Sequence, residues 1–190
     1  EDAAEIDLQQ FRRWYEQAGT PRVRIEQDYD EREKTLTLVV SQSCPPTPEQ
    51  PNKRPFHIPL AIGLLDRHGK DLPLRLAGEP HAGETTRILD LTEERQRFRL
   101  LDIEERPVLS ALRGFSAPVR LETSSDKEDL AFRLAHDSDP FNRWEAGQAL
   151  ALQELQQQLD CWQQGRPQAL SPLFVNAWRR SEERFSRNAE

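Results

Sequence analysis

Few residues in this chain of 190 have the chemistry for metal binding or catalysis, and they are scattered. The histidines are His57, His68, His81 and His136. None of them belongs to a His-Glu-x-x-His motif, in which two histidines on one helix face bind zinc. The cysteines, Cys44 and Cys161, are far apart and have no metal-ligand spacing. We therefore expect no metal-binding residue, no cofactor-binding residue and no bound cofactor within this chain.

His136, Asp137 and Asp139 form the one cluster whose residue types suit a metal ion. They stand between two expected helices, where carboxylates commonly cap a helix end. We favour this capping interpretation, and a metal site is the alternative. His57 is expected on a strand face opposite an apolar stripe, which favours a surface or interdomain residue over a ligand.

The sequence also gives no pattern for acid–base or nucleophilic catalysis. Paired carboxylates can act as general acid and base, but the acidic pairs here stand at turns and helix caps, where acids are normally solvated. They are Glu93/Glu94, Glu104/Glu105 and Asp126/Glu128/Asp129. There is no Gly-x-Ser-x-Gly motif and no glycine-rich phosphate loop. Cys44 precedes two prolines, where an activated nucleophile is hard to hold rigidly. We expect no catalytic residue in this chain.

Arg95, Arg97 and Arg99 alternate along an expected strand, so their side chains share one face. A solvated outer face is the interpretation we favour, and contact with an acidic neighbouring domain is the alternative. A nucleic-acid stripe conflicts with the net charge of −7, which comes from 26 basic and 33 acidic residues. We therefore expect no nucleic-acid partner.

The apolar runs and the cysteines indicate where in the cell the protein is expected. The longest apolar run, Ile58–Leu65, is far shorter than the roughly 20 residues that a membrane helix needs, so we expect no membrane partner. Two lone cysteines fit a reducing cytoplasm better than a disulfide framework. The expected location is cytoplasmic.

Hydrophobic periodicity divides the chain into three zones. Residues 4–18 follow the helical period, and Gly19 and Pro21 end that helix. From residue 21 to 122 the period changes to two. The clearest stripe consists of Phe56, Ile58, Leu60, Ile62 and Leu64. Further short candidates lie at 23–29, 36–40, 72–76, 85–91, 95–101, 107–113 and 119–122. Seven or eight short strands with no helices between them predict an antiparallel, immunoglobulin-like β-sandwich.

The third zone returns to helical signals, with helices expected at 128–136, 139–164 and 172–187. Ser125-x-x-Glu128 resembles a capping box, and Asp139-Pro140 is a typical helix start. Two apolar stripes follow, made by Trp144, Leu152, Leu155, Leu159 and Trp162 and by Phe174, Trp178 and Phe185. Three helices cannot cover both, so we expect the start of a larger helical domain. In this chain the uncovered helices can fold back on the sandwich, pair with a second copy or fray. We favour pairing, as a homodimer caused by truncation.

The chain begins with Glu1 and has no methionine. A complete translation product begins with methionine, so we expect this chain to be a piece of a longer protein.

Several short motifs occur in a recognisable order. The first is Trp14-x-x-Gln17-x-Gly19-x-Pro21. The later ones are Ser41-Gln42, Pro46-Thr47-Pro48-x-Gln50, His57-Ile58-Pro59, Phe115-Ser116-Ala117-Pro118-Val119 and Asp139-x-Phe141-x-Arg143-Trp144-x-Ala146. Together they resemble the bacterial branch of the aminopeptidase N family, which consists of zinc metallo-aminopeptidases. The resemblance spans nearly the whole chain and weakens after about residue 160.

The resemblance implies three parts: residues 1–19 as the terminal helix of a catalytic domain, 20–122 as a β-sandwich domain and 123–190 as the start of a C-terminal helical domain. It implies partners within one parent chain, namely the catalytic domain and the remaining helical domain, and a peptide substrate for the parent only. The family's zinc motif and its Gly-x-Met-Glu-Asn motif are both missing here, so no site residue is carried over.

The implied function is that of a non-catalytic segment in a parent enzyme that uses zinc to remove N-terminal residues from peptides. The segment would space and orient the helical cap relative to the zinc cleft, and alone it would not be an enzyme. The alternative is a stand-alone β-sandwich interaction module unrelated to proteolysis. A His-Glu-x-x-His motif upstream in the same gene would separate the two.

Overall fold

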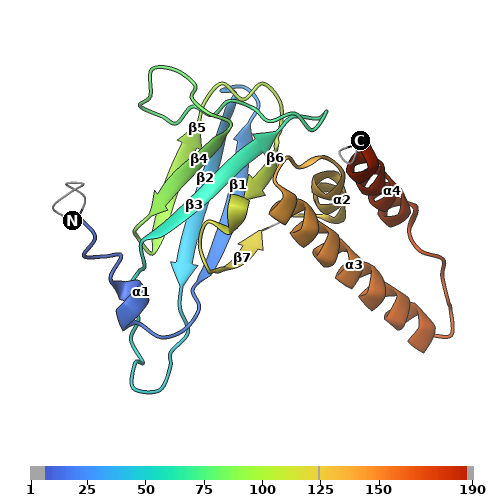
Figure 1. Cartoon of the computed structure of the whole chain (residues 1–190), viewed down its shortest axis with the longest axis horizontal. Helices are drawn as coiled ribbons and strands as arrows, with labels where there is room; N and C mark the ends of the chain where they lie inside the picture. Colours follow the sequence, from blue (N-terminus) through green and yellow to red (C-terminus); the bar gives the residue numbers. More distant parts are fainter. Residues whose placement is uncertain (1–6, 124, 188–190) are drawn as a thin grey trace.

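The structure is a computed structural model that describes residues 7–123 and 125–187. Seven strands form two sheets that pack face to face, and helices follow at one side (Figure 1). The strands are β1 Arg22–Asp30, β2 Thr35–Ser43, β3 Ile58–Leu65, β4 Thr86–Leu91, β5 Arg95–Leu100, β6 Val108–Ala111 and β7 Arg120–Thr123. The predicted fold class, a β-sandwich followed by helices, is confirmed.

The two sheets have the orders β5-β2-β1-β7 and β4-β3-β6. All neighbouring strands are antiparallel except β1 and β7, which pair in parallel with Arg22 opposite Arg120. The sandwich is therefore not wholly antiparallel as predicted. The parallel pair follows from topology, because β7 enters the sheet from the opposite layer after the short 3-10 turn Arg113–Phe115.

The core lies between the sheets and uses alternate residues of each strand. All five residues of the predicted stripe from Phe56 to Leu64 are at most 1% exposed. Val23 and Ile25 of β1 and Leu38 and Val40 of β2 face them from the other sheet. Each buried leucine or isoleucine contributes roughly 1.5–3 kcal/mol through removal from water. The stripe therefore supplies much of the free energy that keeps the layers together.

Two predicted elements differ from the structure. The expected strand at 72–76 is irregular, because its backbone divides its hydrogen bonds between the two sheets. Leu72 N–H donates to Leu64 O in one sheet, and Ala77 N–H donates to Arg99 O in the other. The expected helix at 4–18 reduces, within the described residues, to α1, Arg13–Glu16. Residues 4–6 of that expected helix lie outside the described residues.

Three helices follow the sandwich, and their bounds agree closely with the predicted ones. They are α2 Lys127–His136, α3 Pro140–Gln163 and α4 Pro172–Arg187. Asp139 accepts a hydrogen bond from Asn142 N–H at 2.8 Å and caps α3, as expected. The cap of α2 is Asp126, which accepts from Asp129 N–H at 2.7 Å, so the prediction of Ser125 was wrong. Ser125 bonds instead to Thr123.

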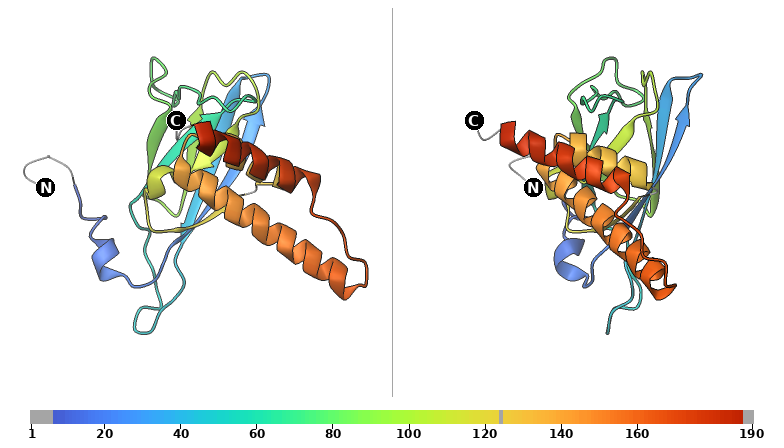
Figure 2. Two further views of the ribbon diagram at one scale, coloured as in Figure 1. Left: turned by 45° about the vertical axis from the view of Figure 1, so that its right-hand side comes forward. Right: turned by 90° about the vertical axis from the view of Figure 1, so that its right-hand side faces the viewer.

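The helices cover one another only in part. Leu130, Leu134, Ala146, Leu150 and Ala177 form a small second core between them. Figure 2 shows α4 running beside α3. The side of α3 that faces away from this core is apolar and exposed. This exposed α3 stripe consists of Trp144, Leu152, Leu155, Leu159 and Trp162, which are between 52% and 71% exposed. Trp178 of α4 is also exposed, and the side chain of Phe185 lies outside the described part.

The length and composition of a helix determine whether it can cross a membrane. Across the described residues, none of the helices combines the length and the apolar character that crossing a membrane requires.

The alternation of buried and exposed residues along β4 can be tested with two neighbouring substitutions. Leu89 is 1% exposed and Ile88 is 57% exposed. Leu89→Asp should lower the free energy of unfolding by about 4 kcal/mol, because it buries an unpaired carboxylate. Ile88→Asp should lower it by less than about 1 kcal/mol. Urea unfolding measures both values, and similar losses would show that the register is wrong.

Self-association through the exposed α3 stripe remains a prediction. An apolar patch of this extent is unfavourable in water, so the chain should sediment as a dimer at micromolar concentrations. The double variant Leu155→Glu, Leu159→Glu should sediment as a monomer with an unchanged circular dichroism spectrum. A wild-type chain that stays monomeric across the concentration range would contradict the prediction.

Candidate functional site

The residues singled out from the sequence are dispersed in the structure. His68 and His81 are exposed in loops. His57 is half-buried, with its Nε2 2.8 Å from Asp90 Oδ1 and its ring against Phe11. The free cysteines belong to different parts of the chain. The structure therefore brings none of these residues together in a common site.

The cluster of His136, Asp137 and Asp139 has the geometry of a helix junction. Asp139 caps α3, and its Oδ2 also accepts from Gly114 N–H at 2.9 Å. Asp137 Oδ1 accepts from Asp139 N–H at 3.0 Å. Within the described ranges, no three His, Cys, Asp or Glu residues are placed to hold a metal ion. These residues do not fit a zinc ion.

The three arginines of β5 lie on the outer face of the four-stranded sheet, where Arg95, Arg97 and Arg99 are all exposed. Arg95 Nη2 is 3.5 Å from Glu26 Oε2 on β1. The expectation of a solvated outer face agrees with this placement. Contact with an acidic neighbouring domain is not tested by it.

The site with the most concentrated polar chemistry is the junction between sandwich and helices, and its centre is Arg113. This arginine follows β6 and is only 6% exposed. Its Nε donates to Ser110 Oγ at 2.9 Å, its Nη1 to Thr86 Oγ1 at 2.9 Å and its Nη2 to Asp71 Oδ1 at 2.5 Å. Nη2 is also 3.6 Å from Asp137 Oδ1, which is fully buried. One guanidinium thus joins strands of the sandwich to the α2–α3 connection.

A second set of contacts reinforces this junction. Asn142 of α3 donates from Nδ2 to Ser110 Oγ at 2.8 Å, so Ser110 bonds to both Arg113 and the helix. Arg143 Nη1 donates to Asp137 O at 2.7 Å. Arg113, Ser110 and Asn142 are therefore paired across the two parts, which fixes the orientation of the helices relative to the sandwich.

Sequence reasoning did not identify Arg113, although Gly63 carried a signal. A glycine within an apolar strand indicates that another group approaches the backbone closely. In the structure, a Cβ on Gly63 would lie 2.0 Å from Arg113 Cζ, so the guanidinium occupies the space that any other side chain would need.

Burial raises the pKa of Asp137 above the usual aspartate range. The Asp139 N–H and the Arg113 and Arg133 charges act in the opposite direction but do not outweigh burial. The junction therefore holds a carboxyl group whose charged form is costly in the folded state.

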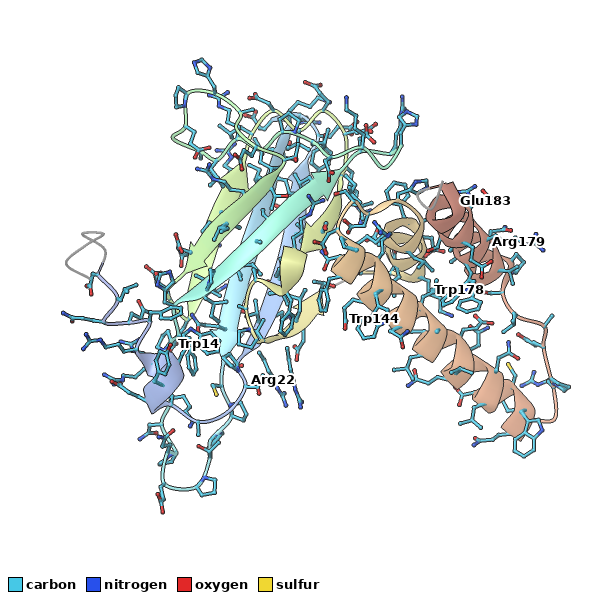
Figure 3. All side chains as sticks on the ribbon, in the orientation of Figure 1. Trp14, Arg22, Trp144, Trp178, Arg179 and Glu183 are labelled. Atoms are coloured by element: carbon cyan, nitrogen blue, oxygen red, sulfur yellow. The ribbon has the colours of Figure 1, made fainter. Side chains whose placement is uncertain are left out.

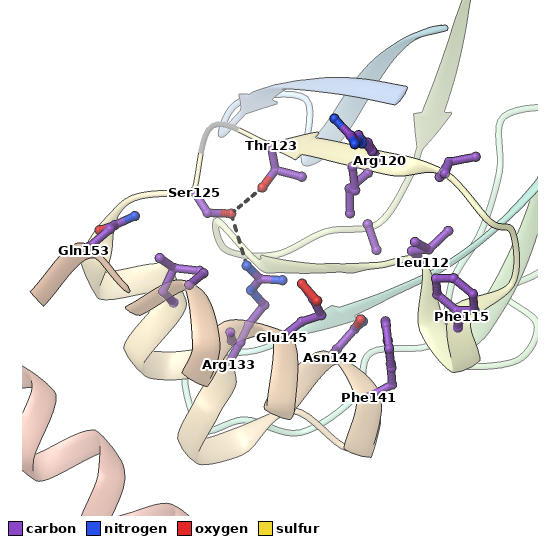
Figure 4. Close-up of a pocket in the computed structure, with 16 residues that line it drawn as sticks. Leu112, Phe115, Arg120, Thr123, Ser125, Arg133, Phe141, Asn142, Glu145 and Gln153 are labelled. Carbon is purple, nitrogen blue, oxygen red and sulfur yellow. Dashed lines mark hydrogen bonds between the residues drawn. The ribbon is translucent and has the colours of Figure 1, made fainter. Parts of the chain in front are cut away.

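A pocket opens beside this junction, between the end of the sandwich and the helices (Figure 4). This junction pocket has a volume of about 470 Å³. Its apolar wall comes from Leu112 and Phe115 on the sandwich side and from Phe141 on the helix side. Its charged residues are Arg133 of α2 and two further side chains, Arg120 and Glu145.

A clamp of side-chain hydrogen bonds holds the N-terminal segment at another edge of the sandwich. Trp14 Nε1 donates to His57 O at 2.8 Å, and the indole packs on Phe56 with ring centroids 4.7 Å apart (Figure 3). Gln17 pairs with the backbone of Arg54 in both directions, at 2.9 and 2.8 Å. This explains two positions of the Trp-x-x-Gln spacing.

Glutamines complete the N-terminal clamp. Gln50 Oε1 accepts from Ala18 N–H, and its Nε2 donates to Glu16 O, both at 2.8 Å. Gln42, which is buried, bonds to both the carbonyl and the N–H of Phe56 at 2.8 and 2.7 Å. Several motifs that carry the family resemblance thus hold backbone segments in place.

Comparison with known proteins defines the class of this chain. A family model described as a domain of unknown function (DUF3458) with an Ig-like fold matches residues 19–124. A second, described as DUF3458_C with ARM repeats, matches residues 127–184. Because the first model alone covers more than half of the residues, the chain belongs to this family of Ig-like domains.

Curated relatives make the assignment more specific. The chain is 39% identical over 179 residues to aminopeptidase N of Escherichia coli strain K12, covering 94% of this chain and 20% of the relative. Identity to aminopeptidase N of Haemophilus influenzae is 41% over 178 residues, covering 93% and 20%. For Caulobacter vibrioides it is 48% over 150 residues, covering 79% and 16%. The chain is homologous to aminopeptidase N and spans about a fifth of its length or less.

A solved structure agrees with this assignment. The crystal structure of Legionella pneumophila aminopeptidase A in complex with aspartic acid matches with a TM-score of 0.72 and 25% identity. The match covers 93% of this chain and 18% of that one.

The Arg113 junction can be tested by removing its charge. Arg113→Leu should lower the free energy of unfolding by about 3–5 kcal/mol, because it strands two carboxyl groups, Asp71 and the buried Asp137. Arg97→Leu, on the exposed face, should change it by no more than about 0.5 kcal/mol. The double variant Arg113→Leu, Asp137→Leu should recover part of the loss. Equal losses in both arginine variants would contradict the role of Arg113.

The raised pKa of Asp137 predicts a pH dependence with a definite sign. Its contribution to stability is fully present below the unfolded-state pKa of about 3.9 and is lost as pH rises through the higher folded-state pKa. The free energy of unfolding of the wild type, relative to Asp137→Asn, should therefore fall as the pH rises above about 4. Unfolding titrations at several pH values measure it, and a rise with pH would refute the sign.

Proposed function

We propose that this chain is a non-catalytic segment of a zinc aminopeptidase, in which the sandwich sets the position of the helical domain relative to the catalytic domain. The aminopeptidase N relatives and the match to an aminopeptidase structure support the enzyme class. The parent would be a hydrolase of the metallopeptidase class that removes N-terminal residues from peptides. Its zinc would be held by residues outside this chain.

The observation that carries the spacing role is that both ends of the sandwich are fixed. The N-terminal clamp holds residues 14–18 against the loop at 50–57 through both side-chain and backbone groups. The Arg113 junction fixes the helices at a separate place, as the positions of α1 and α2 in Figure 1 illustrate. A body attached rigidly at two places transmits a fixed distance and angle. Such a spacer would govern the access of peptides to the active site.

The two free cysteines, Cys44 and Cys161, support a reducing compartment such as the cytoplasm for the parent.

The spacing role is testable in the longer enzyme that contains this segment. Asn142→Ala removes the bond to Ser110 and loosens the junction mildly. We expect it to change the ratio of kcat/KM for a ten-residue peptide to kcat/KM for an aminoacyl p-nitroanilide severalfold, with unchanged zinc content. Arg97→Gln is the matched control and should leave the ratio as it is.

The 190-residue chain provides the second arm of this experiment. It should hydrolyse neither substrate and should retain no stoichiometric zinc after chelation and reloading. An unchanged ratio in Asn142→Ala would refute the spacing role, and hydrolysis by the purified chain would refute its non-catalytic character.

A further inference from the structure

Arg133 is a buried charge without the partners that buried charges normally have. Its side chain is on α2, and the residue is 7% exposed. No carboxylate of the described residues lies within ion-pair distance of it. Its Nη2 donates to Ser125 Oγ at a long 3.5 Å, and its Nε has no hydrogen-bond partner in the described part of the chain. Arginine remains charged in proteins, so this guanidinium lacks a counter-ion in direct contact among the described residues.

Arg113 provides an internal comparison. The two arginines are buried to the same degree and both lie at the junction. The guanidinium of Arg113 donates from all three nitrogens and bonds to a carboxylate at 2.5 Å. Asp137, Asp129 and Glu145 influence Arg133 only from a distance, and burial lowers its pKa in spite of them. Native structures pair such groups, so the difference between the two arginines indicates a missing partner.

The junction pocket, which Arg133 lines, has space for a ligand that would pair with the guanidinium. Figure 4 shows its guanidinium between Ser125 and Glu145, with Phe115 and Phe141 further along the same pocket. The volume of about 470 Å³ is within the range of sites for small molecules. Pockets between two structural parts are common places for such sites.

The chemistry of the wall narrows the class of ligand. Among the described lining residues two are arginines, Arg120 and Arg133, and one is acidic, Glu145. The pocket is therefore more positive than a chain with a net charge of −7. The remainder of the wall is largely apolar, with Leu112, Phe115 and Phe141 among its residues. Arg120 is exposed, so Arg133 is the one buried guanidinium of the lining, and with its apolar surroundings it suits a single negative charge on an apolar body.

We propose that the junction pocket binds a small monocarboxylate with an apolar body, whose carboxylate pairs with Arg133 and whose body lies against the packed rings of Phe115 and Phe141. A guanidinium donates two parallel hydrogen bonds to a carboxylate. A phosphate is less suited, because the apolar wall and the nearby Glu145 disfavour a second negative charge. This site is independent of the proposed spacing role.

The test uses two probes of the same shape and different charge, 4-methylpentanoate and 4-methylpentanamide. Calorimetric titration of the 190-residue chain should give a dissociation constant for the carboxylate at least about tenfold lower than for the amide. Arg133→Gln should abolish this difference. Glu145→Gln should tighten binding of the carboxylate, because it removes a repelling charge. Arg97→Gln, on β5 at the opposite edge of the sheet from β7, should change nothing.

A pocket variant and a stability measurement serve as controls for the binding test. Ala149→Leu narrows the pocket without touching Arg133, and should weaken both probes alike. Arg133→Gln should melt no lower than the wild type without ligand, because it removes an unpaired buried charge. The proposal is overturned if the carboxylate and the amide bind equally, if Arg133→Gln retains the preference for the carboxylate, or if that variant melts several degrees lower.

Discussion

The burial of one guanidinium, that of Arg113, is the constraint on which the arrangement of sandwich and helices depends. Taking a charge out of water is costly unless it has partners, and here hydroxyls and carboxylates from four separate segments contact the three guanidinium nitrogens. Those partners can meet at one point only if β4, β6 and the α2–α3 connection hold fixed relative positions. Further contacts at the junction, such as Asn142 to Ser110, add to an orientation that the guanidinium already determines.

The N-terminal clamp and the Arg113 junction hold the sandwich through different kinds of interaction. The N-terminal clamp consists largely of neutral amides and an indole that bond to backbone groups, as Gln17 does with Arg54. The Lys53 ammonium adds a bond to Ala18 O. The helical attachment depends on buried charge instead. The first tolerates changes of pH and salt better, whereas the second is sensitive to the ionisation of Asp137.

Periodicity predicted most of the strands and the three C-terminal helices, because their apolar spacing is local information. Asp139 and Pro140 placed the start of α3 to within a residue. The segment at 72–76 was misassigned because its hydrogen bonds go to two sheets, which no local pattern reveals. The junction could not be predicted for the same reason, since Asp71 lies 42 residues and Thr86 27 residues from Arg113. Gly63 was the one sequence signal for the Arg113 junction.

That glycine has a consequence for sequence change in this family. A guanidinium held by several partners cannot move aside, so a Cβ at position 63, 2.0 Å from Arg113 Cζ, would displace the whole network. A larger residue at 63 becomes acceptable only when position 113 has already lost its arginine, and the loss of that arginine strands Asp71 and Asp137. Positions 63, 71, 113 and 137 are therefore expected to change together in evolution. A chimera that takes its sandwich from one relative and its helices from another should combine residues at these positions that do not fit each other.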